Sequence, residues 1–455
     1  MATQVLPSSG LPASRTQLAR ILGLGFGLAV TFGGMVGVGI LRLPGTIAGE
    51  LRSFWLIQFV WIAGACYAVL CAFSVAELGA ALPQAGGFYI YSRRAFGAGV
   101  GFVVGWADWL SNCAAVAYGA VAASECIATF SPALSNRQTP IALAILTLFC
   151  VLHAAGLKLS SSVQKLTSSV TAITFLALAA ACLLHPPAAP QAIAPSPASP
   201  GFSFALMLVP LVDAFRAIVV AYDGWYEAIY FTEEDTNAAK HLPRAMIGGA
   251  CSVLVLYLLL NLAFLHVLSI PALGASKLPA VEAARIVFPS WGGEFVTLLS
   301  LFTLLSLTNA MLLGTPRILL AIGRDGLFTE RAARVGPGGT PLTAMLMSAV
   351  AAGLLIASGR FEDIIAIAAI LVTALYATSF IAVFVLRVRE PELPRPFRAW
   401  GYPVSTALVL VGSLVFLIAA IYDDMTSALR VLALIAFAVP SYLWLRWKNR
   451  NRNPV

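Results

Sequence analysis

The stretch VVAYDGWYEAIYFTEE, residues 219–234, lies inside an apolar segment that is long enough to cross a bilayer. A charged carboxylate at membrane depth costs roughly 2.5–3.5 kcal/mol even on the lenient insertion scales, so Asp223 and Glu227 are expected to face protein, water or a ligand. Gly224 interrupts the helix beside Asp223, because Gly lowers helix stability by about 1 kcal/mol relative to Ala. A broken helix at this depth is tolerated only where it is buried in protein or lines a cavity. We therefore expect this stretch to form half of a binding site in the middle of a membrane.

The composition around this stretch is that of an all-α integral membrane protein. Hydrophobic residues make up 60% of the chain and charged residues 11%, with a mean hydropathy of +0.88, whereas soluble domains carry about 25% charged residues. No period-two alternation of a membrane barrel is present. Apolar runs of about 20 residues predict roughly twelve transmembrane helices. They are 21–48, 54–81, 100–130, 138–156, 162–184, 205–232, 245–269, 293–320, 341–358, 363–387, 402–422 and 427–446.

The net charge of +8 reflects the distribution of basic residues around these spans. Most of the 28 Lys and Arg residues fall on one side when both termini are placed inside. By the positive-inside rule, both termini are then cytoplasmic. The C-terminal run RWKNRNR is expected to anchor at the surface of the lipid bilayer, and no nucleic acid is expected as a partner.

Neither cysteines nor the N-terminus point to a further kind of site. All seven cysteines lie in predicted spans without metal-site spacing, so we expect small core residues, no metal and no cofactor. Residues 1–20 are polar and lack an apolar segment of their own. They are interpreted as a disordered cytoplasmic tail, not a signal peptide.

A second helix break is predicted in the first span, which contains TFGGMVGVGILRLPG at residues 31–45. Its clustered glycines allow a ligand to approach closely, or alternatively allow tight helix–helix packing. The break in the sixth span favours the ligand. Paired broken helices at corresponding positions of two repeats are the best sequence indication of a transporter binding site.

The chain divides accordingly into two five-helix halves, 21–184 and 205–387. A Pro/Ala-rich linker, 185–204, is expected on the outside. The last two helices lie outside the repeat, at 388–447, and a short cytoplasmic tail, 448–455, ends the chain.

Three loops on the predicted inner side carry opposite charges at helix ends. They lie within 75–97, 231–249 and 314–330. These charges either form a salt-bridged inner gate or are simply solvated, in which case each pair contributes little. We expect the gate for one or two pairs.

Seven motifs in order resemble the amino acid–polyamine–organocation transporters, especially the L-type amino acid transporter branch. They are GVGI (37–40), AELGAALPQAGGFYIY (76–91), YDGWYEAIYFTEED (222–235), LPRAMIGG (242–249), PRILLAIGRDGLF (316–328), GTPLTA (339–344) and RPFRAWGYPV (395–404). The resemblance covers most of the chain. It implies twelve spans with a five-plus-five inverted repeat, broken helices one and six, and movement of amino acids or related amines by alternating access.

The resemblance also implies how a substrate is held. Backbone N–H groups at the break of span one hold the substrate carboxylate, which here means Val36, Gly37, Val38, Gly39 and Ile40. The positive end of the second half-helix removes the need for a basic side chain. Carbonyl groups in span six hold the substrate ammonium, which here means Val219, Val220, Ala221 and also Asp223.

Some positions depart from the family pattern. Many members carry an aromatic gate where this chain has Val220, so Tyr222 or Trp225 takes that role or the gate is looser. Related members have a lysine in span five at the position of Thr171. The coupling ion is therefore open. The outer loop FSPALSNRQTP, residues 130–140, lacks the cysteine that bonds a partner in animal members. We expect no disulfide-linked heavy chain, and a bacterial inner membrane.

Further polar residues in the spans are candidates for coupling or gating. Asp108 and Glu125 either meet a substrate side chain, or Asp108 pairs locally with Ser111 or Asn112 and Glu125 lies near the outer surface. Ser306 and Asn309 in span eight are candidates as well. Ser306 and Thr308 do not share one helix face, because they are two residues apart, which argues against sodium.

His153 and His266 are expected at the membrane interface, since both lie near span ends. Three roles stay open for Asp223: it binds the substrate ammonium, takes up a proton, or caps the second half of span six.

The sequence shows neither the polar faces of a channel nor a converging catalytic constellation of an enzyme. A secondary transporter of a small-molecule substrate is the function that these patterns favour, with an amino acid as the first substrate class and a polyamine or other organic amine as the alternative.

Overall fold

The computed structural model describes residues 17–37, 39–188 and 204–452. These residues form helices and connecting loops, and within them the only β-type pairing is an isolated parallel bridge between Leu22 and Asp235. The helices are α1 (Leu24–Met35), α2 (Gly39–Leu51), α3 (Phe54–Ala81), α4 (Phe88–Phe96), α5 (Ala98–Thr129), η2 (Pro132–Leu134), α6 (Gln138–Ala154), α7 (Leu157–Leu184), α8 (Phe204–Ala221), η3 (Glu227–Phe231), α9 (Ala238–Val267), α10 (Ile270–Ala275), α11 (Pro279–Val287), α12 (Gly292–Arg324), α13 (Leu342–Ser358), α14 (Phe361–Arg389), α15 (Val404–Asp423) and α16 (Met425–Arg452).

The predicted all-helical membrane architecture is confirmed. Among the described residues, 8 helices are long and apolar enough to cross a membrane, and up to 9 if the bent pair α1 and α2 counts as one span. The shorter apolar helices α6 and α13 have 17 residues each. The predicted segment 54–81 coincides with α3, whereas α16 continues to Arg452, into the segment expected to be a tail.

Both predicted helix breaks are present. α1 ends at Met35 and α2 begins at Gly39, with a bend of 47° between them. α8 ends at Ala221, and a series of turns leads to the short 3₁₀ helix η3. The second part of span six is therefore shorter and more tightly wound than a second half-helix.

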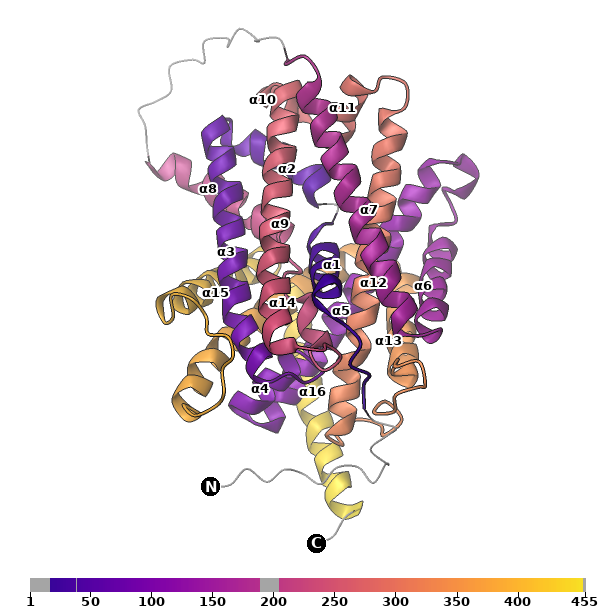
Figure 1. Ribbon diagram of the computed structural model, residues 1–455, viewed down its shortest axis with the longest axis vertical. Coiled ribbons are helices and arrows are strands. Elements are labelled where there is room, and N and C mark those ends of the chain that lie inside the picture. The colour runs from indigo at the N-terminus through magenta and orange to yellow at the C-terminus, as the bar shows by residue number, and fades with distance from the viewer. Residues whose placement is uncertain (1–16, 38, 189–203, 453–455) are drawn as a thin grey trace.

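The core of the bundle lies around α1 and α12. Figure 1 shows α1 in the middle of the molecule, and it contacts α7, α9 and α12. Nearly every side chain of α12 from Thr303 to Gly323 is buried, as expected for a helix that is apolar on all sides. Two cysteines depart from the expected core placement, because Cys66 and Cys251 are exposed.

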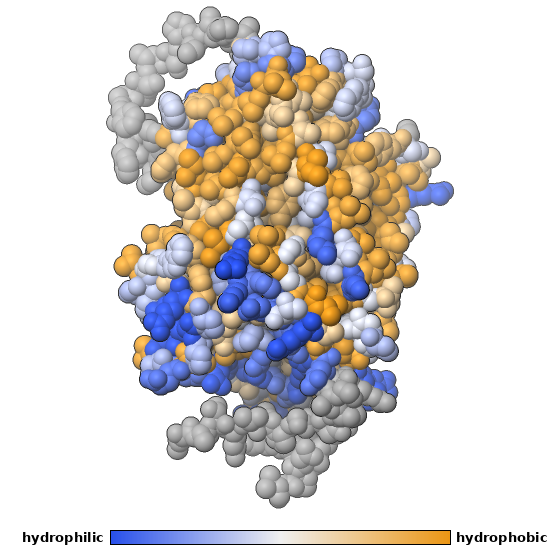
Figure 2. Space-filling view, viewed as in Figure 1, coloured by the Kyte–Doolittle hydropathy of each residue, from blue (hydrophilic) through white to orange (hydrophobic). Residues whose placement is uncertain are grey.

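The surface has a hydrophobic band and a hydrophilic end. Figure 2 shows hydrophobic residues over the upper and middle parts of the visible face and hydrophilic residues gathered at the lower end. α4 and the end of α16 lie at that lower end in Figure 1. α4 carries Arg93 and Arg94 in its last turn, and α14 carries Arg387 and Arg389 in its last turn.

Candidate functional site

The two helix breaks touch each other in the interior. Gly224 has a φ of +92°, and a Cβ atom added there would lie 2.4 Å from the carbonyl oxygen of Gly34. Only glycine combines this backbone conformation with so close a contact. On the other side of the break, a Cβ atom on Gly39 would lie 3.6 Å from the Cα of Ala221. The ends of α1, α2 and α8 thus converge on one place.

Tyr257 of α9 joins the two breaks by its hydroxyl group. This oxygen lies 3.2 Å from the carbonyl oxygen of Met35 and 3.3 Å from that of Ala221. Its ring is fully buried against Tyr222 and Trp61, with ring centroids at 5.1 and 5.5 Å. Tyr257 could not be selected from the sequence, because a lone tyrosine in an apolar span is usually a packing residue.

The start of α2 supplies most of the backbone N–H groups expected to bind a carboxylate. Because α2 begins at Gly39, the N–H groups of Gly39 and Ile40 have no partner within the helix. A Cβ atom on Gly37 would meet nothing within 4 Å, so there is open space at the break. Val38 lies outside the described residues.

Val36 departs from the expected set. Its N–H already donates to the carbonyl of Phe32 at 2.8 Å and closes the last turn of α1. In this structure that group is therefore not free for a ligand.

The carbonyl groups at the end of α8 are partly engaged. The Val220 carbonyl accepts from the Asp223 N–H at 3.3 Å, and the Ala221 carbonyl faces Tyr257. The Val220 side chain is 70% exposed, whereas Tyr222 and Trp225 are buried. Val219 is half-buried.

Asp223 is held by a hydroxyl group. The Tyr376 hydroxyl of α14 donates to its Oδ1, and the Gly224 N–H lies near the same carboxylate. Asp223 does not cap η3, because this helix has no side-chain cap. Of the N–H groups that the capping role would satisfy, it contacts that of Gly224. Tyr376 itself packs against Trp225, with ring centroids 5.2 Å apart.

Asp108 shows the expected local pairing and one long-range contact. Its Oδ1 accepts from the Asn112 amide at 2.9 Å and from the Tyr230 hydroxyl at 2.7 Å. Ser111 instead donates to the Asp108 backbone carbonyl at 3.0 Å. Asp108 therefore links α5 to η3. Glu125 is exposed.

A second polar network connects α7 and α12. The Gln164 amide nitrogen lies 3.4 Å from the Ala29 carbonyl of α1 and 3.1 Å from each of the Ser168 and Ser306 hydroxyl oxygens. These oxygens are therefore satisfied by an amide donor. Thr171 is buried nearby on α7, and its hydroxyl has no partner among the described residues.

Asn309 continues this network to α6. It donates to Gln164 Oε1 at 2.6 Å, and its Oδ1 lies 2.8 Å from His153 Nε2. The expectation that His153 is interfacial is wrong, because its ring is 1% exposed and bonded inside the bundle. Thr308 bonds the Leu304 carbonyl at 2.8 Å and faces Gly119 of α5, so it does point away from the network.

Ion pairs join the three loops that the sequence predicts to lie on the inner side. Arg317 forms a bidentate ion pair with Glu234, with both N–O distances at 2.8 Å. Arg324 Nη1 lies 2.7 Å from Glu233 Oε2. Arg93 of α4 pairs with Asp325. The interaction is therefore more extensive than the one or two pairs expected.

The backbone before α1 is hydrogen-bonded to one of these loops. The N–H groups of Ile21 and Leu22 donate to the Glu234 carbonyl at 3.0 and 2.9 Å, and Thr236 N–H donates to the Leu22 carbonyl at 2.9 Å. Burial works to raise the pKa of Glu233, but the hydrogen bond and charge of Arg324 outweigh it, so this pKa lies below its ordinary value.

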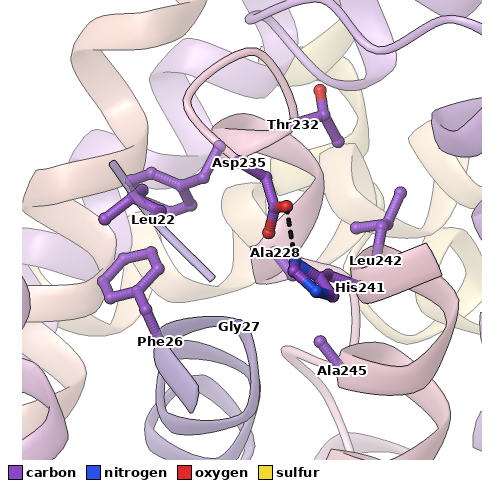
Figure 3. Close-up of a pocket in the computed structure, with 10 residues that line it drawn as sticks. Leu22, Phe26, Gly27, Ala228, Thr232, Asp235, His241, Leu242 and Ala245 are labelled. Carbon is purple, nitrogen blue, oxygen red and sulfur yellow. Dashed lines mark hydrogen bonds and ion pairs between the residues drawn. The ribbon is translucent and has the colours of Figure 1, made fainter. Parts of the chain in front are cut away.

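A small pocket lies beside these backbone contacts, between the start of α1 and the start of α9 (Figure 3). Leu22, Phe26 and Ala245 give it apolar walls, and Asp235 and His241 form a pair across it at 2.8 Å. It is not formed by the break residues. Among the described residues no group of His, Cys, Asp and Glu side chains is arranged to hold a metal ion.

Comparison with known proteins identifies the family. Residues 27–446 match the model of the family described as "Amino acid permease". The serine/threonine exchanger SteT of Bacillus subtilis is 26% identical over 452 residues, which are 94% of this chain and 97% of that protein.

Human relatives cover similar shares. The human b(0,+)-type amino acid transporter 1 is 24% identical, over 89% of this chain and 83% of its own, and the human Asc-type amino acid transporter 1 is 25% identical, over 96% and 84%. The family and these relatives are transporters, not enzymes. The match over most of the length and the apolar helices show that this chain is an integral membrane protein of the amino acid permease family.

Proposed function

We propose that this protein is a secondary active transporter that carries amino acids across a cell membrane by alternating access, as a permease or an exchanger. The observation that supports this most directly is the contact of two broken helices through Gly34 and Gly224. Broken helices that meet at membrane depth place unpaired backbone groups where a substrate can use them.

The proposed site divides an amino acid between the two breaks. The N–H groups of Gly39 and Ile40 face the substrate carboxylate, supported by the positive end of α2, while the Gly37 N–H reaches the Tyr257 hydroxyl in this structure. The carbonyl groups at the end of α8, at Val219 to Ala221, and the Asp223 carboxylate face the ammonium. The open space at Gly37 is the room for the substrate between them.

Sodium coupling is disfavoured by the network between α7 and α12. The oxygens of Ala29, Ser168 and Ser306 already surround the Gln164 amide. Because the neutral Gln164 amide occupies the place among these oxygens where a sodium ion would bind, we propose that a proton gradient or substrate exchange drives transport.

The proposed topology has twelve spans, with a five-plus-five repeat and two additional C-terminal helices. Both termini face the cytoplasm, and the membrane is the inner membrane of a bacterium. This assignment is supported by the basic residues at one end of the bundle. We propose that the chain works without a disulfide-linked heavy chain.

A second candidate substrate class is an organic amine such as a polyamine. Three acidic side chains, Asp108, Asp223 and Glu227, lie in the interior around η3, and such an environment favours cations over carboxylates. The two classes require different contacts at the break of span one.

Counterflow in liposomes tests the proposal. In separate assays, purified protein is reconstituted with unlabelled L-serine, L-threonine, L-alanine or putrescine inside, and the same compound is added outside in labelled form. We expect accumulation of at least one labelled amino acid above the level in protein-free liposomes. Accumulation of putrescine alone would transfer the assignment to amines, and no accumulation of any substrate in the panel would contradict transport of these classes.

A further inference from the structure

Glu227 is a buried carboxylate without a hydrogen-bond partner. It is the first residue of η3 and is 0% exposed, and neither of its side-chain oxygens has a partner among the described residues. Buried polar groups in native proteins are almost always hydrogen-bonded, so each exception needs a physical reason. Glu227 combines the largest such deficit with a position beside the candidate substrate site.

The backbone packs tightly around this side chain. A Cβ atom on Gly34 of α1 would lie 2.6 Å from Glu227 Cγ, and one on Gly314 of α12 would lie 3.5 Å from its Oε2. Two glycines thus allow the carboxyl group to lie between α1 and α12.

The groups around Glu227 are acidic or phenolic. Asp108 on α5 and Asp223 in the break act on it electrostatically, and one oxygen of Asp108 is itself without a partner. The tyrosines near this cluster are Tyr226 and Tyr230 on the same segment and Tyr376 on α14.

The basic groups on the helices packed against η3 are paired elsewhere or exposed. Arg317 and Arg324 of α12 pair with Glu234 and Glu233, and His241 of α9 pairs with Asp235. Lys240 and Arg244 of α9 are exposed. The described segment of α1, LGFGLAVTFGGM, has no titratable side chain. Within the part of the chain that the structure describes, no ion pair neutralises Glu227.

An ionised carboxylate in this position would be strongly disfavoured. The effective cost of burying an ion is of the order of several kcal/mol, and here no donor or opposite charge reduces it. The uncharged acid avoids that cost. An ionisable residue inside a membrane protein is a candidate functional site for the same reason.

We propose that Glu227 is the proton-binding site that couples amino acid transport to a proton gradient. This inference rests on the proposed transport function. In the arrangement described here, one O–H bond on the Glu227 carboxyl holds the proton. When α1 moves away from η3, water reaches the carboxyl group, the O–H bond breaks and the proton passes to water on that side.

The location explains why the proton and the substrate are coupled. The cover over Glu227 is Gly34, the same residue that contacts Gly224 in the second break. Any substrate that rearranges the breaks therefore changes the access of water to Glu227. Asp223 differs in its contacts, because the Tyr376 hydroxyl donates a hydrogen bond to its carboxylate and the Gly224 N–H lies near it.

Proton flux and counterflow in the same liposomes test the inference. The full-length chain is reconstituted with a trapped pH-sensitive dye, and uptake of labelled L-serine, or of the panel amino acid with the strongest counterflow, is measured with and without an inward proton gradient. Glu227→Gln keeps the shape of the side chain but carries no titratable proton. Glu50→Gln is the matched control, because Glu50 is exposed on α2.

For wild type and Glu50→Gln we expect the gradient to stimulate uptake and amino acid to acidify the interior. For Glu227→Gln we expect both effects to disappear while counterflow continues. Glu227→Asp keeps a titratable group and is expected to retain stimulation with a shifted pH profile, which serves as the test if the glutamine variant does not fold.

Three results overturn the inference. One is wild-type counterflow without any response to the gradient, which leaves the proposed transport function intact. Another is loss of stimulation in Asp223→Asn with full stimulation in Glu227→Gln. The third is a Glu227→Gln variant that loses only cationic substrates and keeps its proton coupling. Absence of wild-type counterflow for every amino acid would instead count against the proposed function.

Discussion

Gly34 in the first broken span and Gly224 in the sixth are in direct backbone contact, so close that a Cβ atom on Gly224 would lie 2.4 Å from the Gly34 carbonyl oxygen. Two segments almost two hundred residues apart thereby form one site. Either break alone would leave unpaired backbone groups in the bundle, whereas together they define a place for a ligand.

The first prediction concerns this contact. Gly224→Ala places a Cβ atom against Gly34 and imposes a φ of +92° on a residue that disfavours it, which costs about 1–3 kcal/mol from the conformation alone. We expect a lower melting temperature in detergent and loss of counterflow. Gly25→Ala on α1 is the matched control, because its Cβ atom meets nothing within 4 Å; equal damage in both variants would argue against a special role for the contact.

The second prediction concerns the bridge made by Tyr257. Tyr257→Phe removes the hydroxyl that reaches Met35 and Ala221 but keeps the ring packing. A typical hydrogen bond contributes about 0.5–1.5 kcal/mol, so the fold is expected to survive. Counterflow should slow clearly, because the two breaks are no longer held together. A variant with wild-type transport rates would show that the bridge is dispensable.

The third prediction concerns the inner closure and its pH dependence. The pKa of Glu233 is lowered by Arg324 against the opposing effect of burial, so the stabilisation from this pair is present above the ordinary carboxyl pKa and is lost as pH falls through the lowered pKa. Glu233→Gln should mimic the acidic condition at neutral pH. We expect a cysteine placed at Ala228, which lines the pocket of Figure 3, to react faster with a soluble thiol reagent when Glu233→Gln is present than when Glu233 is kept. The native cysteines are replaced by alanine in both of these proteins.

Unchanged labelling at Ala228→Cys would mean that Glu233 does not keep the inner side closed. The exposed Glu330→Gln serves as the control for loss of one acidic charge in the same region.

The fourth prediction concerns topology. Ser196→Cys lies in the linker between the two predicted halves, outside the described residues. We expect an impermeant thiol reagent to label it in intact cells. Labelling that requires permeabilisation would refute the five-plus-five arrangement with cytoplasmic termini.

Much of the fold could be predicted, because the length of an apolar segment and a cluster of glycines determine helix formation within that segment itself. The segment 54–81 coincides with α3, and the breaks at Gly34 to Gly39 and at Asp223 follow from helix propensity and charge burial. The ion pairs between the loops could also be predicted, since Glu233, Glu234 and Arg317 lie at helix ends with complementary charge.

The partners of the site residues could not be predicted in the same way. The contact of Asp223 with Tyr376 and the bridge by Tyr257 depend on how distant helices cross. Glu227 was recognised as an acidic residue at depth, but its lack of a partner is visible only when every neighbour has a place. His153 was misplaced because its position near a helix end does not reveal the Asn309 that faces it.

The central claim is that the break of span one binds the carboxylate of an amino acid, and competition in counterflow tests it most directly. Unlabelled L-serine, L-serine amide and ethanolamine compete with labelled L-serine for the wild type and for Gly37→Val, which fills the open space at the break. For the wild type, we predict that only unlabelled L-serine reduces the uptake of labelled L-serine. Gly37→Val is predicted to fold normally but to lose uptake. Equal competition by the amide, or normal uptake by Gly37→Val, would contradict carboxylate recognition at this break.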